Sequence, residues 1–131
     1  MDTFDNEYTK RILACAYAVH TELGPGLLES VYEKALVYEL RSQGFKVDNQ
    51  VKVPVIYKGK QIDDTLKLDI IVDDKIIIEL KAQKEIQPIH MKQLLTYLRL
   101  THHMLGYLIN FDVISLKTGI KRVINTQNFK E

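Results

Sequence analysis

Residues 66–82, with the sequence LKLDIIVDDKIIIELKA, constrain the fold of this chain more than any other stretch. Leu66, Leu68, Ile70 and Val72 alternate with other residues, which is typical of a β-strand, and residues 73–75 have the composition of a turn. Residues 76–78 are all isoleucine, as expected of a strand that is covered on both faces. The stretch therefore predicts a β-hairpin whose second strand is central in a sheet.

Three charged residues interrupt the apolar character of this hairpin. Glu79 and Lys81 are two residues apart and share one face, where an unpaired buried charge costs on the order of several kcal/mol. A three-residue loop at 73–75 would pair Asp69 with Glu79, whereas a two-residue loop would pair Asp69 with Ile78 and separate the two acids. The sequence alone leaves both registers open.

Two interpretations of these charges follow. Adjacent carboxylates repel each other unless one is protonated or a cation lies between them, and hard oxygen ligands suit Mg²⁺ or Mn²⁺. The alternative is an ordinary ion pair between Glu79 and Lys81, with Asp69 in solvent. Spacing by itself supports the metal site and the ion pair equally.

Two motifs carry a resemblance to known families. Asp69, nine intervening residues and then Glu79-Leu80-Lys81 resemble the core motif of the PD-(D/E)XK nuclease superfamily, with Leu68 where the eponymous proline would stand. The stretch LGPGLLESVYEKAL at residues 23–36 contains GxxExxY and resembles the signature of the bacterial and archaeal GxxExxY protein family, itself assigned to that superfamily. The similarity runs from His20 to Phe111 and so covers nearly the whole chain.

Apolar periodicity and chain breakers predict the order ααβββαββ. Helices are expected up to Leu23, over 27–43 and over 88–100, and strands are expected up to Tyr57, along the hairpin, over 104–111 and over 120–124. This order predicts an α/β (α+β) fold in which a mixed central β-sheet is flanked by helices, and the resemblance implies a restriction-endonuclease-like core. Pro54 predicts an edge strand or a bulge. At this length, residues 1–131 are expected to form a single domain.

The resemblance implies a metal-dependent nuclease. Asp69 and Glu79 would ligate Mg²⁺ or Mn²⁺, and Lys81 would orient or deprotonate the attacking water and contact the scissile phosphate. Gln93 and Tyr97 are four residues apart on a predicted helix and resemble the QxxxY helix of RecB-like members, which lies beside the catalytic acids.

The amino-terminal helices offer two further candidate ligands, His20 and Glu29. In the superfamily the first helix often supplies an acidic residue, while RecB-like members can use a histidine. Mg²⁺ prefers oxygen ligands, so we expect Glu29 to reach the cation directly or through a water. A direct bond from His20 would instead favour Mn²⁺.

Composition says little about the partner. The formal net charge is +1, but residues 1–81 are net negative and residues 82–131 net positive, so the second part could face phosphates. No apolar run approaches the roughly 20 residues needed to span a membrane, no signal peptide is evident, and Cys15 is the only cysteine. We therefore expect a cytoplasmic protein. The resemblance implies that it acts on nucleic acid, with DNA as the expected substrate. The alternative is a nucleic-acid or protein binding module that keeps the nuclease fold without chemistry and could act as a homodimer or with a partner protein.

Overall fold

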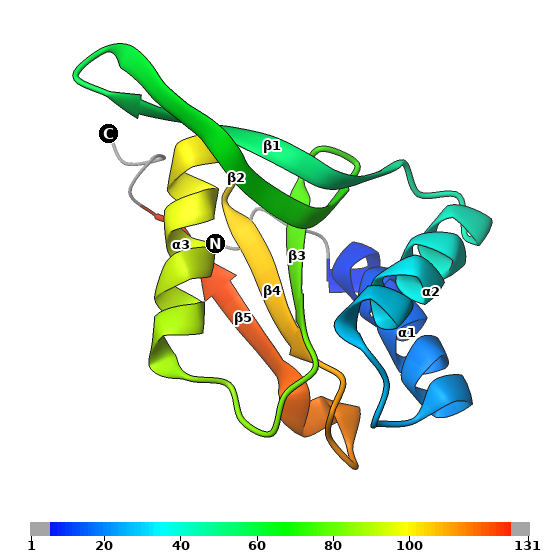
Figure 1. Cartoon of the computed structure of the whole chain (residues 1–131). Coiled ribbons are helices and arrows are strands. Elements are labelled where there is room, and N and C mark those ends of the chain that lie inside the picture. Colours follow the sequence, from blue (N-terminus) through cyan, green and yellow to red (C-terminus); the bar gives the residue numbers. More distant parts are fainter. Residues whose placement is uncertain (1–5, 127–131) are drawn as a thin grey trace.

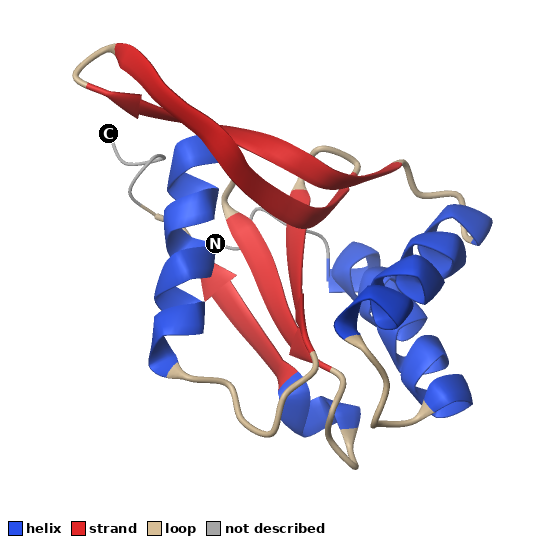
Figure 2. Ribbon diagram, viewed as in Figure 1, coloured by secondary structure: helices blue, strands red, loops and turns tan. Residues whose placement is uncertain are grey.

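The computed structural model describes residues 6–126, and its elements follow the expected order ααβββαββ (Figures 1 and 2). They are α1 (Asn6–Leu23), α2 (Glu29–Ser42), β1 (Val47–Tyr57), β2 (Lys60–Val72), β3 (Ile76–Lys81), α3 (Pro88–Thr101), β4 (Leu105–Asn110), the 3-10 helix η1 (Leu116–Gly119) and β5 (Ile120–Ile124). The predicted helices and the last two strands lie within two residues of these bounds. Local sequence patterns were therefore sufficient to place the elements.

The five strands form one mixed sheet in the order β1-β2-β3-β4-β5. Only β3 and β4 are parallel, and α3 makes the crossover between them, as a parallel pair requires. Helices α1 and α2 cover one face of the sheet and α3 covers the other (Figure 1). The fold is α+β, consistent with a PD-(D/E)XK core. No helix within residues 6–126 is long and apolar enough to cross a membrane.

Strand β3 is the centre of the molecule. Ile76 and Ile78 belong to the hydrophobic cluster beneath α1 and α2, and Ile77 belongs to the cluster beneath α3. All three side chains are fully buried. The run of isoleucines therefore marks a strand covered on both faces, as the sequence predicted.

Strand β1 lies at the edge of the sheet and contains an irregularity at Pro54. The pairing of β1 with β2 shifts between Val53 and Val55, on either side of the proline, which has no N–H to donate. Both the edge position and the bulge predicted from Pro54 are confirmed.

Strand β2 departs from the single apolar stripe that its alternation predicted. Leu68 packs in the cluster beneath α3, whereas Ile70 and Val72 pack in the cluster beneath α1 and α2. The change of face coincides with Gln50 on β1, whose backbone is left-handed with φ of 51°. The pairing keeps its register on both sides of Gln50, so the hairpin twists here without gaining a residue. Asp69 occupies the point where β2 changes face.

The loop between α1 and α2 is fixed by Tyr32. Its hydroxyl donates to the Gly24 carbonyl oxygen at 2.6 Å and accepts the Leu27 N–H at 3.1 Å. Its ring stacks on Phe111 with centroids 4.7 Å apart and planes 8° from parallel. The tyrosine of the GxxExxY motif thus anchors the start of α2, and with it Glu29, to the end of β4.

Candidate active site

The register between β2 and β3 decides whether the two acids meet. Val72 pairs with Ile76 and Ile70 pairs with Ile78, across a three-residue turn at 73–75. Within the turn, Asp73 and Asp74 have φ of 54° and 55°. This is the register that carries Asp69 opposite Glu79, and the alternative two-residue loop is wrong.

Beyond Ile70 and Ile78, side chains replace the backbone ladder. The backbone N–H of Asp69 donates to Glu79 Oε1 at 2.9 Å, and the backbone N–H of Leu80 donates to Asp69 Oδ2 at 2.8 Å. Each carboxylate therefore takes a strand N–H that would otherwise point to the neighbouring backbone. The acids lie side by side where β2 and β3 separate.

Lys81 lies near the two acids but forms no ion pair with either of them. Within the described part of the chain, Lys10 forms an ion pair with Glu7, His103 Nε2 lies 3.0 Å from Asp74 Oδ1, and Lys81 forms no ion pair. Its positive charge still lowers the pKa of both Asp69 and Glu79, in opposition to their burial. The interpretation of Glu79 and Lys81 as an ordinary ion pair is therefore not what the structure shows.

The surroundings of Asp69 and Glu79 disfavour the ionised form of both carboxyl groups. Burial raises the pKa of Glu79 to about 8, and the neighbouring Asp69 carboxylate adds to the shift. Burial also raises the pKa of Asp69, with a contribution from the charge of Glu33. Only 8% of the Glu79 surface is exposed. A bound cation would relieve this repulsion.

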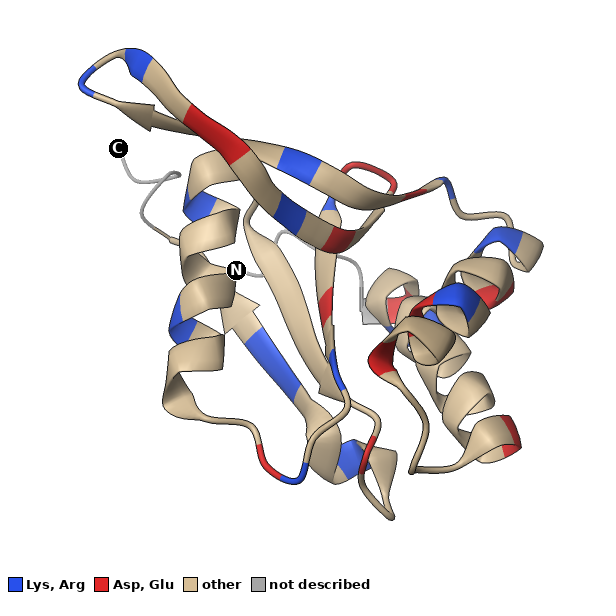
Figure 3. Cartoon of the chain, viewed as in Figure 1, with Lys and Arg blue, Asp and Glu red and all other residues tan. Residues whose placement is uncertain are grey.

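Glu29, in the first turn of α2, faces the same charges. It is exposed as a whole, but partial desolvation raises the pKa of its carboxyl group, and the charge of Asp69 raises it further. Lys81 acts in the opposite direction. Figure 3 shows acidic segments of β2, β3 and the start of α2 around the end of β3. The structure thus brings Glu29 within electrostatic range of Asp69 and Lys81.

Gln93 and Tyr97 approach the acids from α3. Gln93 Nε2 donates to the Tyr97 hydroxyl at 3.1 Å, which confirms that the two side chains share a face of the helix. Only 7% of Tyr97 is exposed, and burial followed by the charges of Glu79 and Asp69 raises its pKa. The phenol therefore lies within electrostatic range of the two carboxylates.

His20 has a different set of neighbours. Its Nε2 lies 2.8 Å from the carbonyl oxygen of Val113, and its ring centroid lies 6.3 Å from that of Phe111. Neither the hydrogen bonds nor the electrostatics of Asp69 and Glu79 involve this histidine. Of the two candidates from the amino-terminal helices, Glu29 lies within electrostatic range of the acids, whereas His20 contacts a backbone carbonyl.

A polar bridge between α2 and β2 was not predicted from the sequence. Gln50 Nε2 donates to both Glu33 carboxylate oxygens, at 2.8 and 3.0 Å, and lies 3.4 Å from Asp69 Oδ1. Asn49 Nδ2 also donates to Glu33, at 3.2 Å. The only sequence signal was the polar run at 48–50, which interrupts an otherwise alternating strand. Gln50 thereby links the orientation of Asp69 to helix α2.

The donor set is suited to a hard cation. Within residues 6–126, no three His, Cys, Asp or Glu side chains converge to form a complete metal cage. Proteins commonly hold Mg²⁺ with one or two carboxylates and leave several coordination positions to water or substrate phosphate. The adjacent oxygens of Asp69 and Glu79 satisfy that requirement, with Glu29 available nearby.

Comparison with known families agrees with this geometry. The model of a family described as the PD-(D/E)XK nuclease superfamily matches residues 6–123. The chain belongs to the PD-(D/E)XK nuclease superfamily. No curated protein and no solved structure matches it. Members of this superfamily typically use divalent metals, so a nuclease that acts on nucleic acid is the activity to test.

Proposed function

We propose that the chain is a metal-dependent phosphodiesterase that hydrolyses nucleic acid, with DNA as the expected substrate. The observation that carries this proposal is the adjacency of the Asp69 and Glu79 carboxylates, both with a raised pKa and neither ion-paired among the described residues. A buried acid beside a half-buried one destabilises a fold through desolvation and repulsion, and a bound cation would relieve this cost.

Asp69 and Glu79 would hold Mg²⁺ or Mn²⁺, and Glu29 would contact the cation directly or through a water. The bound cation supplies positive charge beside the scissile phosphate and makes a neighbouring water more acidic. Lys81, without an ion-pair partner in the described part of the chain, would orient the attacking water, accept its proton when neutral, and contact the phosphate.

Neighbouring residues hold the acids in position. The Tyr97 hydroxyl would donate to a carboxylate or to the substrate phosphate, and Gln93 fixes its orientation. Gln50 restrains Asp69 from the other side. Because a displacement of about 1 Å can reduce catalysis by about two orders of magnitude, such restraints are part of the catalytic machinery.

Within the superfamily, we assign the chain to the GxxExxY family as a single domain over residues 1–131. Support comes from Gly26, Glu29 and Tyr32, because the tyrosine anchors the loop that presents the glutamate. The lone Cys15 is buried and free, which agrees with a reducing, cytoplasmic location.

The proposal is tested by incubating purified protein with single-stranded and duplex DNA in the presence of Mg²⁺ or Mn²⁺. We expect metal-dependent cleavage that falls by about 10²-fold or more in Asp69→Ala, Glu79→Ala and Lys81→Ala, because each removes a charge at the reacting phosphate. Glu85→Ala, an exposed acid outside the site, is the matched control. Cleavage that survives all three substitutions, or no cleavage of DNA or RNA with either metal, would contradict the proposal.

The alternative of a binding module without chemistry makes a different prediction. It rests on the fold alone, since a fold can be kept without its chemistry. Isothermal titration calorimetry with Mg²⁺ and Mn²⁺ distinguishes the two functions, since a nuclease must bind the cation at Asp69 and Glu79 and a module need not.

A further inference from the structure

The β1–β2 hairpin carries two lysines directly opposite each other. Lys52 pairs with Lys67, and both side chains are exposed. Like charges at opposed positions of an antiparallel pair destabilise it. Neither lysine forms an ion pair within the described part of the chain. A bound polyanion would remove this repulsion.

The two lysines lie on the same side of the sheet as α2. Their neighbours Val51, Val53 and Leu68 pack in the cluster beneath α3. Because successive side chains of a strand point to opposite faces, Lys52 and Lys67 project from the other face. Lys52 lies two residues after Gln50, and Lys67 lies two residues before Asp69, so the lysine pair is adjacent to the acids along the hairpin.

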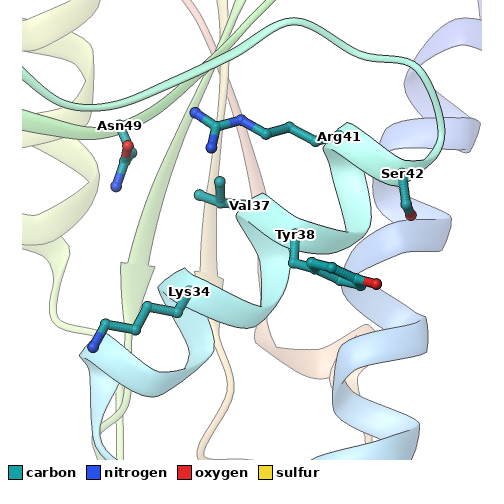
Figure 4. Close-up of a pocket in the computed structure, with 6 residues that line it drawn as sticks. All are labelled: Lys34, Val37, Tyr38, Arg41, Ser42 and Asn49. Carbon is teal, nitrogen blue, oxygen red and sulfur yellow. The ribbon is translucent and has the colours of Figure 1, made fainter.

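A second basic surface lies between α2 and β1. A pocket of about 570 Å³ is lined by Lys34, Val37, Tyr38, Arg41, Ser42 and Asn49 (Figure 4). Lys34 and Arg41 extend from α2 toward the side on which Asn49 lies. Arg41 Nη2 donates to the Val47 carbonyl oxygen at 2.8 Å, and a guanidinium has further N–H groups for a phosphate. Tyr38 is 74% exposed, and its ring points away from Asn49, to the other side of α2, where it is available for stacking on a base beyond the pocket (Figure 4).

A series of side-chain hydrogen bonds links the pocket to the catalytic acids. Asn49, which lines the pocket, donates to Glu33, and Glu33 accepts from the Gln50 amide that reaches Asp69. Along α2, Lys34 and Arg41 are seven residues apart, which is about 10.5 Å of helix axis. That length is on the order of two to three nucleotides, since the rise is about 3.4 Å per nucleotide in a stacked strand and larger in an extended one.

We propose that this surface binds a single nucleic-acid strand and leads it to the acids. Lys34 and Arg41 would contact phosphates in the pocket, Tyr38 would stack on a base, and the Lys52–Lys67 pair would contact the phosphates on the other side of Asp69. The inference rests on the proposed function, since it names the substrate class of the same site. An exposed aromatic ring favours an unpaired base, because the bases of a duplex already stack on each other. All four basic residues lie within residues 1–81, which carry a net negative charge. Their local placement therefore matters more for binding than the net charge of that segment.

The test separates binding from cleavage. Fluorescence anisotropy of a short fluorescein-labelled oligodeoxythymidylate is measured in EDTA, over a series of KCl concentrations, with the full chain carrying Glu79→Gln. Two double variants are added to that background: Lys52→Gln with Lys67→Gln, and Lys34→Gln with Arg41→Gln. The matched control is Lys117→Gln with Lys121→Gln, two exposed lysines next to and on β5, at the opposite edge of the sheet.

Loss of two phosphate contacts should reduce the slope of log K against log salt by about 1.4, because each contact to a single strand contributes about 0.7. Each site variant should show this change and weaker binding, while the control should match the parent. Tyr38→Ala should weaken binding without changing the slope, and Tyr38→Phe should retain the affinity. The melting temperature of Lys67→Gln should equal or exceed that of the parent.

Equal slopes for the parent, the site variants and the control would overturn the inference. Tighter binding of duplex than of single strands, lost in the same variants, would overturn the single-strand assignment. Cleavage is tested separately with the native residues and metal. Binding that obeys the salt prediction without any cleavage would refute the proposed function alone, and cleavage with unchanged slopes would refute this inference alone.

Discussion

Glu79 sets the pH dependence of the isolated fold. Its carboxyl group is buried next to Asp69, and its pKa rises from 4.5 to about 8. The folded chain therefore holds this proton more tightly than the unfolded chain. Since the state that binds more protons is favoured at low pH, the contribution of Glu79 to stability decreases as the pH rises between these two values.

In metal-free buffer, we expect the melting temperature to decrease as the pH is raised from about 5 to about 8. Glu79→Gln removes the titrating group and should flatten this part of the profile. Differential scanning calorimetry across the pH series measures both chains, with the exposed Glu85→Gln as the control. A profile that rises with pH, equally in all three chains, would mean that the Glu79 pKa is not raised.

Asp69 gives a second prediction for a single residue. Asp69→Asn keeps a carbonyl oxygen that can accept the Leu80 N–H and removes a charge next to Glu79. In metal-free buffer its melting temperature should equal or exceed that of the parent. The free energy of unfolding should increase by at most about 1 to 3 kcal/mol. Urea denaturation gives the free energy of unfolding. A clear loss of stability would assign Asp69 a structural role instead.

Helix α2 links the site to the amino-terminal half of the chain. Glu29 and Glu33 are one turn apart on the helix, and Tyr32 between them anchors the preceding loop to the backbone and to Phe111. The GxxExxY motif therefore combines a residue that faces the site with the residue that fixes the helix start. The position of Glu29 therefore depends on the Tyr32 hydroxyl group.

Tyr32→Phe should destabilise the fold by about 1 to 3 kcal/mol, because the Gly24 carbonyl and the Leu27 N–H lose a partner in a partly buried loop. The stacking on Phe111 is retained in the variant. Urea denaturation measures the loss, and Tyr38→Phe, at an exposed position of the same helix, should change stability little. Equal stability of the two variants would contradict the anchoring role.

For the whole molecule, the site lies between two layers that pack independently on the sheet. The first layer is α1 and α2, and the second is α3. Glu29 belongs to the first layer and Tyr97 to the second, while Asp69 and Glu79 belong to the sheet between them. A cation at the acids would thus stabilise all three layers.

Mg²⁺ should raise the melting temperature progressively with the logarithm of its concentration above Kd. The corresponding gain in unfolding free energy is about 2.7 kcal/mol at a concentration of 100 times Kd. Its affinity should increase with pH up to about 8, because Glu79 must lose a proton before it binds the cation. Thermal shift with Mg²⁺ measures the effect, and Ca²⁺ and Na⁺ serve as ion controls. An equal shift in Asp69→Asn and Glu79→Gln would place the cation elsewhere.

The sequence by itself determined the elements and named the candidate residues of the site. Periodicity, Gly and Pro breakers and the isoleucine run act through neighbouring residues, so helices, strands and the central position of β3 followed from local patterns. The motif spacing identified the superfamily, and it paired Asp69 with Glu79 once the turn was known to have three residues.

Only the tertiary structure decided which face of the sheet each side chain takes and which distant residues it contacts. The change of face at Asp69 depends on Gln50 of the neighbouring strand, and the position of His20 depends on Val113, 93 residues away. Tyr32 closes a contact with Phe111 that no local pattern encodes. A local pattern reports only the preferences of neighbouring residues, whereas these orientations depend on partners that the fold brings together from distant parts of the chain.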